Sequence, residues 1–306
     1  MGRPEAVERW PWLGEADWAA IDAAFPVRIP RGYVAGEHPA ALLSALPDAR
    51  ELTGDAGDVD DPVGDARMSP VPWVVRKHRD RVLLLLTKRC HLYCRYCFRR
   101  NHRPGAAQDP TPAEWDAMLA YAAASDAREV ILSGGDPLAV SDAKVFAAID
   151  AVRPRTIRVH TRAPITAPRR VTDALVEGLR ARAPVWVLVH ANHPAELGPD
   201  VAAALGRLVD AGLPVLNQAV LLAGVNDDPD VLAALSARLV ELRVFPYYLH
   251  HCDAAQGNAH FRVDPRRGLA IWRALRERTS GIGLPAYVVD RPDGGGKVSV
   301  EEWLAE

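Results

Sequence analysis

From Arg81 onward, the chain alternates between short apolar segments of strand length and longer segments with helical patterning. The apolar segments span residues 82–87, 129–133, 156–160, 185–190, 214–220 and 244–249. Buried strands that alternate with helices predict a parallel sheet with crossover helices. Six such units favour a partial (β/α)6 TIM-like barrel over the eight-unit barrel, and a doubly wound sheet is the alternative α/β fold.

Local capping signals mark where several helices begin and end. Residues 111–114 read Thr-Pro-Ala-Glu, a capping box with proline at the first helical position. Asp264 and Pro265 start a later helix, and Gly212 lies where a helix would stop before the next strand. These signals support the alternation of strands and helices.

Length, composition and charge exclude several classes of protein. The chain has 306 residues, of which 49% are hydrophobic and 25% charged, and its net charge is −2. This balance is typical of a globular protein with a sizeable core. No basic stripe indicates a nucleic-acid partner, and no apolar run approaches the ~20 residues that would span a membrane. Because we see no secretory signal pattern, we expect a cytoplasmic protein.

Three segments are expected along the chain. Residues 1–71 form an N-terminal helical arm that carries Trp10, Trp12 and Trp18 and ends in a linker, whose Gly- and Asp-rich part is residues 53–65. Residues 72–290 form the barrel, which is a usual size for one α/β domain. Residues 291–306 form a C-terminal segment.

Polar residues follow the apolar segments, at the points where the strands are expected to end. Because the carboxyl ends of barrel strands meet at one face, such residues converge in space. A loop cap would explain any one of these polar ends, but six in register predict a shared site. They are residues 90–97, 133–137, 160–162, 190, 217–218 and 247–253.

Cys90, Cys94 and Cys97 are spaced C-x3-C-x2-C directly after the first apolar segment. An iron–sulfur cluster normally takes four cysteine ligands, and the fourth cysteine, Cys252, is far along the chain. A cubane held by three thiolates keeps one iron open to a substrate or cofactor, as catalytic metal sites do. The spacing therefore predicts a catalytic cluster.

Cysteines can also be small buried hydrophobes, zinc ligands or disulfide partners. Disulfides are rare in the reducing cytosol. A zinc site would want a fourth Cys or His at ribbon- or finger-like spacing, which His91 and His102 do not provide. The iron–sulfur cluster is the interpretation we favour.

Residues 87–100 read Thr-Lys-Arg-Cys-His-Leu-Tyr-Cys-Arg-Tyr-Cys-Phe-Arg-Arg. This segment resembles the signature of radical S-adenosylmethionine (SAM) enzymes, and its last seven residues resemble the lysine 2,3-aminomutase family. The resemblance extends over residues 72–297. It implies a barrel of the radical SAM type with three cofactors: a [4Fe–4S] cluster on the three cysteines, SAM, and pyridoxal 5′-phosphate (PLP).

The Gly-Gly-Asp sequence after the second apolar segment is weak evidence alone, since a plain βα turn would also explain it. Two glycines after a strand let the backbone approach a ligand closely. Placed one unit after the cysteines, the sequence resembles the motif that receives the methionine amino group of SAM. In the family, many members have His where Tyr96 stands. The residues that the resemblance implies at this end of the cofactor site are Tyr96, Ser133, Gly134, Gly135, Asp136, His190 and Gln218.

Lys297 follows three glycines and the apolar run 286–289. A phosphate-binding P-loop would need Gly at Arg291 and Ser or Thr at Val298, so that interpretation fails. A solvated lysine is the plain alternative. The segment instead resembles the one that carries the PLP lysine of 2,3-aminomutases, and lysines form Schiff bases with PLP. By the same resemblance, Lys77 and Arg81 bind the PLP phosphate; both could otherwise be surface charges.

The resemblance also implies how an amino-acid substrate is bound. Arg99 matches an arginine that binds the substrate carboxylate, which suits its planar fork. Asp253 and Asp290 match two aspartates that hold the distal ammonium of lysine. Each alone could be a surface residue, but the pair favours lysine, and a glutamate-using relative would be expected to lack it.

These residues predict an isomerase that converts L-lysine to β-lysine by 2,3-migration of the amino group. The chain is closest to short family members that make β-lysine for elongation factor P, because it ends soon after Lys297 without an extended, cysteine-rich region. Two alternatives stay open: a 2,3-aminomutase for arginine, ornithine or glutamate, and a non-catalytic iron–sulfur protein. A reducing partner such as flavodoxin or ferredoxin is expected, and a homo-oligomer, the product stereochemistry and the pathway are left open.

Overall fold

The computed structural model describes residues 15–33, 38–100, 107–152 and 155–306. One sheet of nine strands runs through it, and the strands lie in the sheet in the same order as in the chain. Strands β2 to β8 are parallel, while β1 and β9 pair antiparallel at the two edges. The strands are β1 (Val74–Val75), β2 (Arg81–Leu85), β3 (Glu129–Ser133), β4 (Thr156–His160), β5 (Val185–Val189), β6 (Val215–Leu221), β7 (Phe245–His251), β8 (Ala286–Arg291) and β9 (Gly296–Ser299).

This strand order confirms the partial barrel and excludes the doubly wound sheet, in which the order reverses part-way. The six predicted strands are β2 to β7. The apolar run at residues 286–289 forms a seventh parallel strand, β8, which the six-unit prediction leaves out. Its hairpin with β9 places the chain around Lys297 inside the sheet rather than in a tail.

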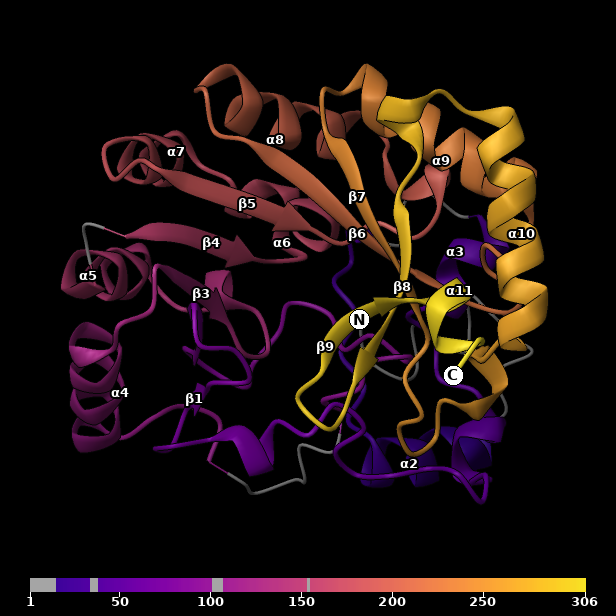
Figure 1. The fold of residues 1–306 in the computed structure, drawn as a ribbon, viewed down its shortest axis with the longest axis horizontal. Coiled ribbons are helices and arrows are strands. Elements are labelled where there is room, and N and C mark those ends of the chain that lie inside the picture. Colours follow the sequence, from indigo (N-terminus) through magenta and orange to yellow (C-terminus); the bar gives the residue numbers. More distant parts are fainter. Residues whose placement is uncertain (1–14, 34–37, 101–106, 153–154) are drawn as a thin grey trace.

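Helices form an outer layer that follows the curved sheet in an arc, and the strands fan out inside this arc (Figure 1). The capping box at residues 111–114 is confirmed, because Thr111 and Glu114 exchange their hydrogen bonds at the start of α4. Asp264 caps α10, and Gly212 has a φ of +80° just after α8. The helices are α2 (Glu15–Ala24), α3 (Pro39–Leu43), α4 (Pro112–Ala124), α5 (Asp142–Val152), α6 (Ala163–Thr166), α7 (Asp173–Arg180), α8 (Pro199–Asp210), α9 (Pro229–Glu241), α10 (Pro265–Arg278) and α11 (Val300–Trp303).

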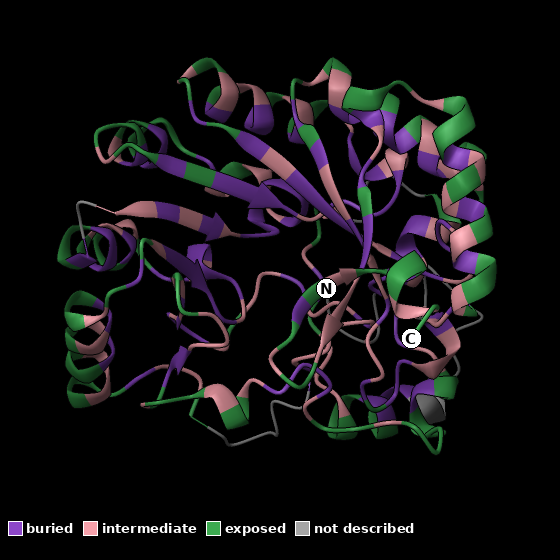
Figure 2. Ribbon diagram, viewed as in Figure 1, coloured by how far each residue is buried: buried purple, intermediate pink, exposed green. Residues whose placement is uncertain are grey.

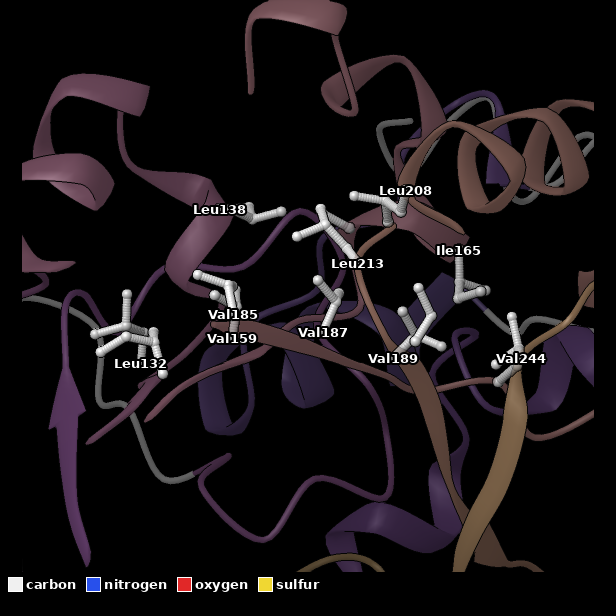
Figure 3. Packing of buried hydrophobic residues seen from close by; sticks show 14 of the residues in the cluster. Leu132, Leu138, Val159, Ile165, Val185, Val187, Val189, Leu208, Leu213 and Val244 are labelled. Carbon is white, nitrogen blue, oxygen red and sulfur yellow. The ribbon is translucent and has the colours of Figure 1, made fainter. Parts of the chain in front are cut away.

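The hydrophobic core lies between the sheet and these helices, and Figure 2 shows buried residues along the strands and exposed ones on the outer helix faces. Strand β4 shows the pattern: Ile157 and Val159 are fully buried, while the intervening Arg158 and His160 line a cavity on the other face. This alternation follows from the two-residue period of a strand. The core residues seen together in Figure 3 include Leu132, Val159, Ile165, Val185, Val187, Val189 and Leu208.

The described part of the N-terminal arm packs as a small cluster of its own, made of Trp18, Ile29, Leu42 and Leu46. Trp10 and Trp12 lie outside the described residues. The Gly- and Asp-rich tract at residues 53–65 contains no helix or strand apart from one bridge to the chain after β7. The segment boundaries at residues 71 and 290 stay predictions. Within the described chain, no helix has the length and apolar character needed to cross a membrane.

Candidate active site

A cavity of about 520 Å³ lies against the inner face of the curved sheet. Alternate strand positions form its walls, such as Arg158 and His160 of β4 and Tyr248 and His250 of β7. Every residue to which the sequence assigns a site role lines this cavity, although their individual roles stay predictions. They are Lys77, Arg81, Cys90, Cys94, Tyr96, Cys97, Arg99, Ser133, Gly134, Gly135, Asp136, His190, Gln218, Asp253, Asp290 and Lys297.

The three cysteines after β2 face the cavity, whereas Cys252 is buried elsewhere, packed with Leu222, Val225 and Phe261. Burial raises the pKa of the Cys97 thiol to about 11, so binding of a metal there releases a proton. In the described ranges, no three His, Cys, Asp or Glu side chains converge on the position of a single ion. Three thiols on one loop, with Cys252 outside the cavity lining, are the residues that would hold the predicted cluster.

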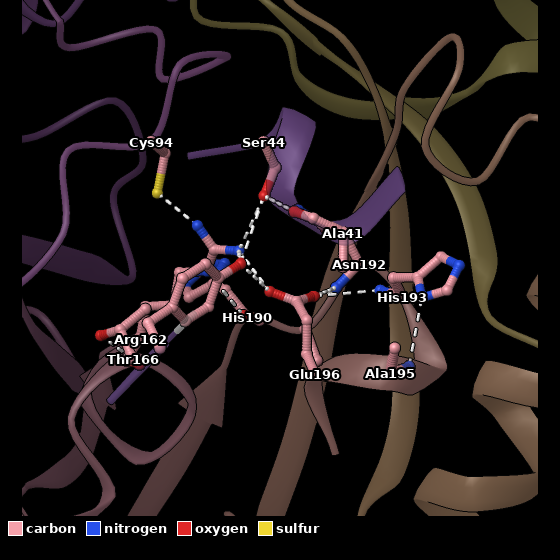
Figure 4. A network of polar contacts seen from close by, with 12 residues as sticks. Ala41, Ser44, Cys94, Arg162, Thr166, His190, Asn192, His193, Ala195 and Glu196 are labelled. Carbon is pink, nitrogen blue, oxygen red and sulfur yellow. Dashed lines mark hydrogen bonds and ion pairs between the residues drawn. The ribbon is translucent and has the colours of Figure 1, made fainter. Parts of the chain in front are cut away.

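Arg162 lies buried beside the cysteine loop, just before α6 (Figure 4). Its Nη1 donates to Cys94 Sγ at 2.7 Å, and its Nη2 pairs with Glu196 Oε1 at 2.6 Å. Its Nε donates to the His190 carbonyl at 3.1 Å, and the Tyr33 hydroxyl donates to the same Glu196 oxygen at 2.6 Å. These contacts hold the guanidinium in one orientation against a predicted cluster ligand.

A second buried ionic group joins the cysteine loop to the N-terminal arm. The Glu51 side chain, with no exposed surface, pairs with Arg95 at 2.5 Å and with Arg100. Arg95 also donates to the Pro26 carbonyl at 2.9 Å. Removing one partner of a buried ion pair costs roughly 3–5 kcal/mol, because the other charge is left uncompensated. The arm therefore fixes the loop that carries the cysteines.

The Gly134–Gly135 turn packs against the chain that leads into the cysteine loop. A Cβ at Gly134 would lie 2.2 Å from the Thr87 carbonyl oxygen, and one at Gly135 would lie 2.3 Å from that of Arg89. Gly134 also has a φ of +123°, which other residues rarely adopt. Two hydrogen bonds join the segments, from Gly135 N to Thr87 and from Asp136 N to Arg89. The sequence relates these glycines to a ligand, but the close neighbour in the structure is protein backbone.

Asp136 is engaged by the protein itself. Its carboxylate accepts hydrogen bonds from Leu138 N at 2.9 Å, Thr161 Oγ1 at 2.7 Å and Arg162 N at 2.9 Å. The side chain is almost fully buried. Asp136 therefore ties the loop after β3 to the end of β4 and fixes the shape of this end of the cavity.

His190, Gln218 and Tyr96 line the same end of the cavity. Burial, together with the nearby charge of Arg162, lowers the pKa of His190 to about 4, so the imidazole is neutral at pH 7. Gln218 stands at a register shift in β6, and such bulges re-aim side chains. The Tyr96 hydroxyl accepts a hydrogen bond from Asn192 at 2.7 Å.

Lys297 lies at the opposite wall, in the β8–β9 hairpin. Its Nζ is 2.8 Å from Asp290 Oδ2, and it lies 5.9 Å from the ring centroid of Tyr248. The chain has four lysines, of which only Lys77 and Lys297 line the cavity. The cavity therefore contains two lysines, of which the sequence predicts Lys297 as the one that carries PLP.

Asp65, which the sequence reasoning missed, joins two predicted ligand-binding cations. Its carboxylate pairs with Lys77 at 3.2 Å and with Arg99 at 2.7 Å. Burial acts to raise the pKa of Asp65, but the charges of Arg99 and Lys77 outweigh it and hold the pKa below its usual range.

Arg81 is the first residue of β2 and also lines the cavity, so the cavity extends along the strands to their amino ends.

Asp253 follows β7, and its carboxylate accepts no hydrogen bond from any residue that the structure describes. Burial and the nearby charge of Asp290 raise the pKa of Asp253 to about 7. The pKa of Asp290 moves the other way: burial acts to raise it, but the ammonium of Lys297 holds it below its usual range. The pKa values of the two aspartates therefore shift in opposite directions, and of the two only Asp290 already has a cationic partner in Lys297.

Two histidines inside the cavity were also not assigned a role from the sequence. The buried Nε2 of His160 has no hydrogen-bond partner among the described residues. Burial and the charge of Arg158 keep its pKa well below the usual range, while burial and Lys297 lower that of His250 to about 3. Both stand on the cavity face of their strands, so the strand alternation was the signal that could have identified them. No comparable signal marks Asp65, which lies in a loop.

Comparison with known proteins tests the family to which this site belongs. Residues 84–235 match the model of the radical SAM superfamily. The L-lysine 2,3-aminomutase of Buchnera aphidicola is 31% identical over 92% of this chain and 85% of that protein. The chain belongs to the lysine 2,3-aminomutase family.

Two longer members of the lysine 2,3-aminomutase family are more similar in sequence than the Buchnera protein. The L-lysine 2,3-aminomutase of Fusobacterium nucleatum is 41% identical over 84% of this chain, and that of Clostridium subterminale is 42% identical over the same share. The chain spans 61% and 63% of the length of these two proteins.

Solved structures confirm the radical SAM fold. Streptococcus suis SuiB bound to S-adenosylmethionine superposes with a TM-score of 0.53 at 14% identity, covering 70% of this chain and 51% of SuiB. The protein anSMEcpe with bound AdoMet gives a TM-score of 0.51 at 11% identity, covering 64% of this chain and 58% of that one. At these identities the likeness concerns the partial barrel alone.

Proposed function

We propose that this chain is a radical SAM aminomutase that converts L-lysine to β-lysine by 2,3-migration of the amino group. The observation that carries the proposal is that one cavity contains three cysteines, a lysine in an ion pair, an arginine and two aspartates. A cluster ligand set, a PLP lysine and partners for both charged ends of lysine thus line one chamber. A non-catalytic iron–sulfur protein would need only the cysteines.

The cysteine end of the cavity is where we place the [4Fe–4S] cluster and SAM. Cys90, Cys94 and Cys97 would hold the cluster, and Cys252, which lies outside the cavity lining, leaves one iron open for SAM. The residues that would contact SAM are Tyr96, Ser133, Gly134, Gly135, Asp136, His190 and Gln218.

The hairpin end of the cavity is where we place PLP. Lys297 would bind it covalently, and Lys77 and Arg81 would bind its phosphate. When bound, SAM on the reduced cluster supplies a radical that removes hydrogen, and PLP stabilises an adjacent radical. The walls of the barrel bind and orient these groups and keep water from them.

The charges of the cavity favour lysine as the substrate. Arg99 would bind the α-carboxylate with a terminal nitrogen that Asp65 leaves free, since Arg99 Nη1 has only a 3.4 Å contact to the Gly134 carbonyl. Asp253 and Asp290 would bind the distal ammonium. This acidic pair speaks against glutamate, while arginine and ornithine also carry a distal cation and are the competing substrates.

A product assay tests the proposal. The anaerobically reconstituted protein, given SAM, PLP, a reductant and L-lysine, should form β-lysine, and chiral chromatography would also reveal its stereochemistry. Parallel reactions with arginine, ornithine and glutamate test the alternatives. A protein that binds the cluster but isomerises none of these amino acids would contradict the proposal.

The cellular setting forms part of the same proposal. The β-lysine would be used to modify elongation factor P, in the cytoplasm, where reducing conditions keep the cysteines free for the cluster. Flavodoxin or ferredoxin would reduce the cluster. Loss of β-lysyl elongation factor P in a deletion strain would test the pathway. Reduction of the cluster by purified flavodoxin and by purified ferredoxin would test the electron donor. Light scattering would give the oligomeric state.

A further inference from the structure

We propose that Arg162 sets the reduction potential of the cluster through its hydrogen bond to Cys94. The inference rests on the proposed binding of the cluster by the three cysteines. It adds an individual role for Arg162, which the sequence places only among the polar residues at the strand ends, and for its partners Glu196 and Tyr33. Arg162 is a positioning residue in this scheme, since it acts on the cluster through a ligand.

The geometry singles out Cys94 among the three cysteines. Its sulfur is the only one of the three that accepts a hydrogen bond from a side chain of the described residues, and the donor is the charged Arg162 Nη1 at 2.7 Å. Arg162 is only 7% exposed, so water does not compete for this contact. Charged donors make hydrogen bonds about twice as strong as neutral ones.

The surroundings of Arg162 hold it at this sulfur. Its Nε is bound to the carbonyl of His190 and its Nη2 to the carboxylate of Glu196, which leaves Nη1 directed at Cys94 (Figure 4). Glu196 is held in turn by the backbone N–H groups of Asn192 and His193, at 2.6 and 3.0 Å. Every side of the guanidinium therefore has an assigned partner.

Hydrogen bonds to the sulfur ligands are among the factors that set the potential of iron–sulfur clusters. Reduction adds a negative charge to the cluster. A cationic N–H on Cys94 Sγ stabilises the more negative state, so Arg162 raises the potential. The negative charge of Glu196 opposes this effect. The potential should therefore lie between the value without the hydrogen bond from Arg162 and the value with the charge of Arg162 uncompensated.

Substitutions on the two sides of the pair should shift the potential in opposite directions. Arg162→Lys replaces the fork by a single ammonium, which cannot reach both Glu196 and Cys94, so the potential should fall. Glu196→Gln keeps an acceptor for the backbone N–H groups but leaves the charge of Arg162 uncompensated, so the potential should rise. A merely structural ion pair would not give opposite signs.

The measurement is a redox titration of the anaerobically reconstituted full chain, without SAM or amino acid, followed by electron paramagnetic resonance. We expect each variant to change the ratio of reduced to oxidised cluster about tenfold at a fixed solution potential, which equals about 59 mV for a one-electron couple. Arg170→Lys is the control: Arg170 pairs with Asp142 at 2.5 Å outside the cavity, so its substitution should leave the potential unchanged.

A second variant covers the case in which Arg162→Lys does not retain iron. Arg162→Leu combined with Glu196→Gln removes both charges, leaves no buried unpaired carboxylate, and should lower the potential below that of Glu196→Gln alone. Equal potentials in the wild type and the variants, or shifts of the same sign for Arg162→Lys and Glu196→Gln, would overturn the inference. Absence of the cluster from the wild type would instead contradict the proposed function.

Discussion

Lys297 and Asp290 face each other across the β8–β9 hairpin, with the ammonium nitrogen 2.8 Å from the carboxylate oxygen. In the proposed function, Lys297 binds PLP and Asp290 binds the distal ammonium of the substrate. The free protein thus already contains an ammonium–carboxylate pair of the kind that lysine would form. In that proposal, the ammonium of a bound lysine would take the place beside Asp290 that the side chain of Lys297 occupies in this structure.

Replacement of Lys297 by Ala should abolish covalent binding of PLP while SAM is still cleaved slowly, because the sites proposed for the two cofactors involve different walls of the barrel. Borohydride reduction followed by mass spectrometry would locate the pyridoxyl group, and 5′-deoxyadenosine formation would report SAM cleavage. Lys144→Ala is the matched control, since Lys144 lies on α5 outside the cavity. A pyridoxyl group on Lys77 in the wild type would show that the assignment is wrong.

Cys252→Ala should retain about four irons per chain after reconstitution, whereas Ala at Cys90, Cys94 or Cys97 should lose the cluster. The reason is that Cys252 packs among apolar side chains apart from the cavity. Iron analysis and absorbance spectra of the four variants would check this. Loss of iron from Cys252→Ala would mean that the cluster has four protein ligands and no open site for SAM.

The sequence was sufficient to predict the barrel and many of the residues that line the cavity. Strand-length apolar segments and helix caps depend on local chemistry, and the alternation fixed β2 to β7 in order. Strand β8 was not counted because a short apolar run near the end of the chain does not by itself reveal which strand it pairs with. The register of β8 with β9 places Asp290 opposite Lys297. This pairing follows from the folded sheet and could not be predicted from the sequence.

The contacts that arise between distant segments could not be predicted. Asp65 reaches Arg99 from a loop, and Arg162 and Glu196 are separated by a strand and two helices, with no spacing that indicates a pair. The sequence explained Gly134 by the close approach of a ligand, but this explanation was incomplete, because its close neighbour is the backbone of Thr87. A sequence pattern can identify such side chains one at a time, but their contacts with each other depend on how the folded sheet brings distant segments together.

Gly134→Ala should destabilise the protein by more than 1 kcal/mol, because a Cβ would clash with Thr87 and the φ of +123° suits only glycine. Gly206→Ala is the control. Gly206 lies inside α8, and a Cβ there would have no neighbour closer than 3.9 Å, so alanine should stabilise by roughly 0.5–1 kcal/mol. Thermal unfolding gives both Tm values. A Tm for Gly134→Ala at or above the wild-type value would contradict the tight packing of this turn.

Replacement of Asp253 or Asp290 by Asn should raise the KM for lysine. Removing one partner of a desolvated charge pair costs roughly 2–5 kcal/mol, or about 30-fold to several thousand-fold in binding. Arg99→Lys should also raise KM, because a single ammonium cannot pair with both Asp65 and the substrate carboxylate, as the planar fork of Arg99 would. SAM cleavage without amino acid should persist in all three. Unchanged lysine kinetics in Asp253→Asn, or turnover of glutamate as fast as lysine, would remove the aspartates from substrate recognition.

The affinity for lysine should depend on pH through Asp253. Burial and the charge of Asp290 raise its pKa to about 7 in the free protein, so below pH 7 the carboxyl is mainly neutral and cannot pair with an ammonium. Binding then requires loss of a proton, and the dissociation constant should increase by up to about tenfold for each pH unit below 7. Above pH 7 the carboxylate is already formed and the dependence should level off.

Calorimetric titration with L-lysine, in buffers of different ionisation enthalpy, would measure both the affinity and the number of protons released. The titrations should run from pH 5.5 to 8.5, about 1.5 units either side of the pKa of Asp253, because a single group completes most of its titration within these limits. Asp253→Asn is the control, because it removes the titrating group: its affinity should be weaker than wild type above pH 7 and nearly independent of pH. The same substitution should raise Tm above that of the wild type by more at pH 8 than at pH 5. The reason is that the raised pKa of Asp253 costs the wild type folding stability as pH rises toward 7. A wild-type affinity that stayed constant across this range would show that Asp253 does not bind the ammonium as a carboxylate.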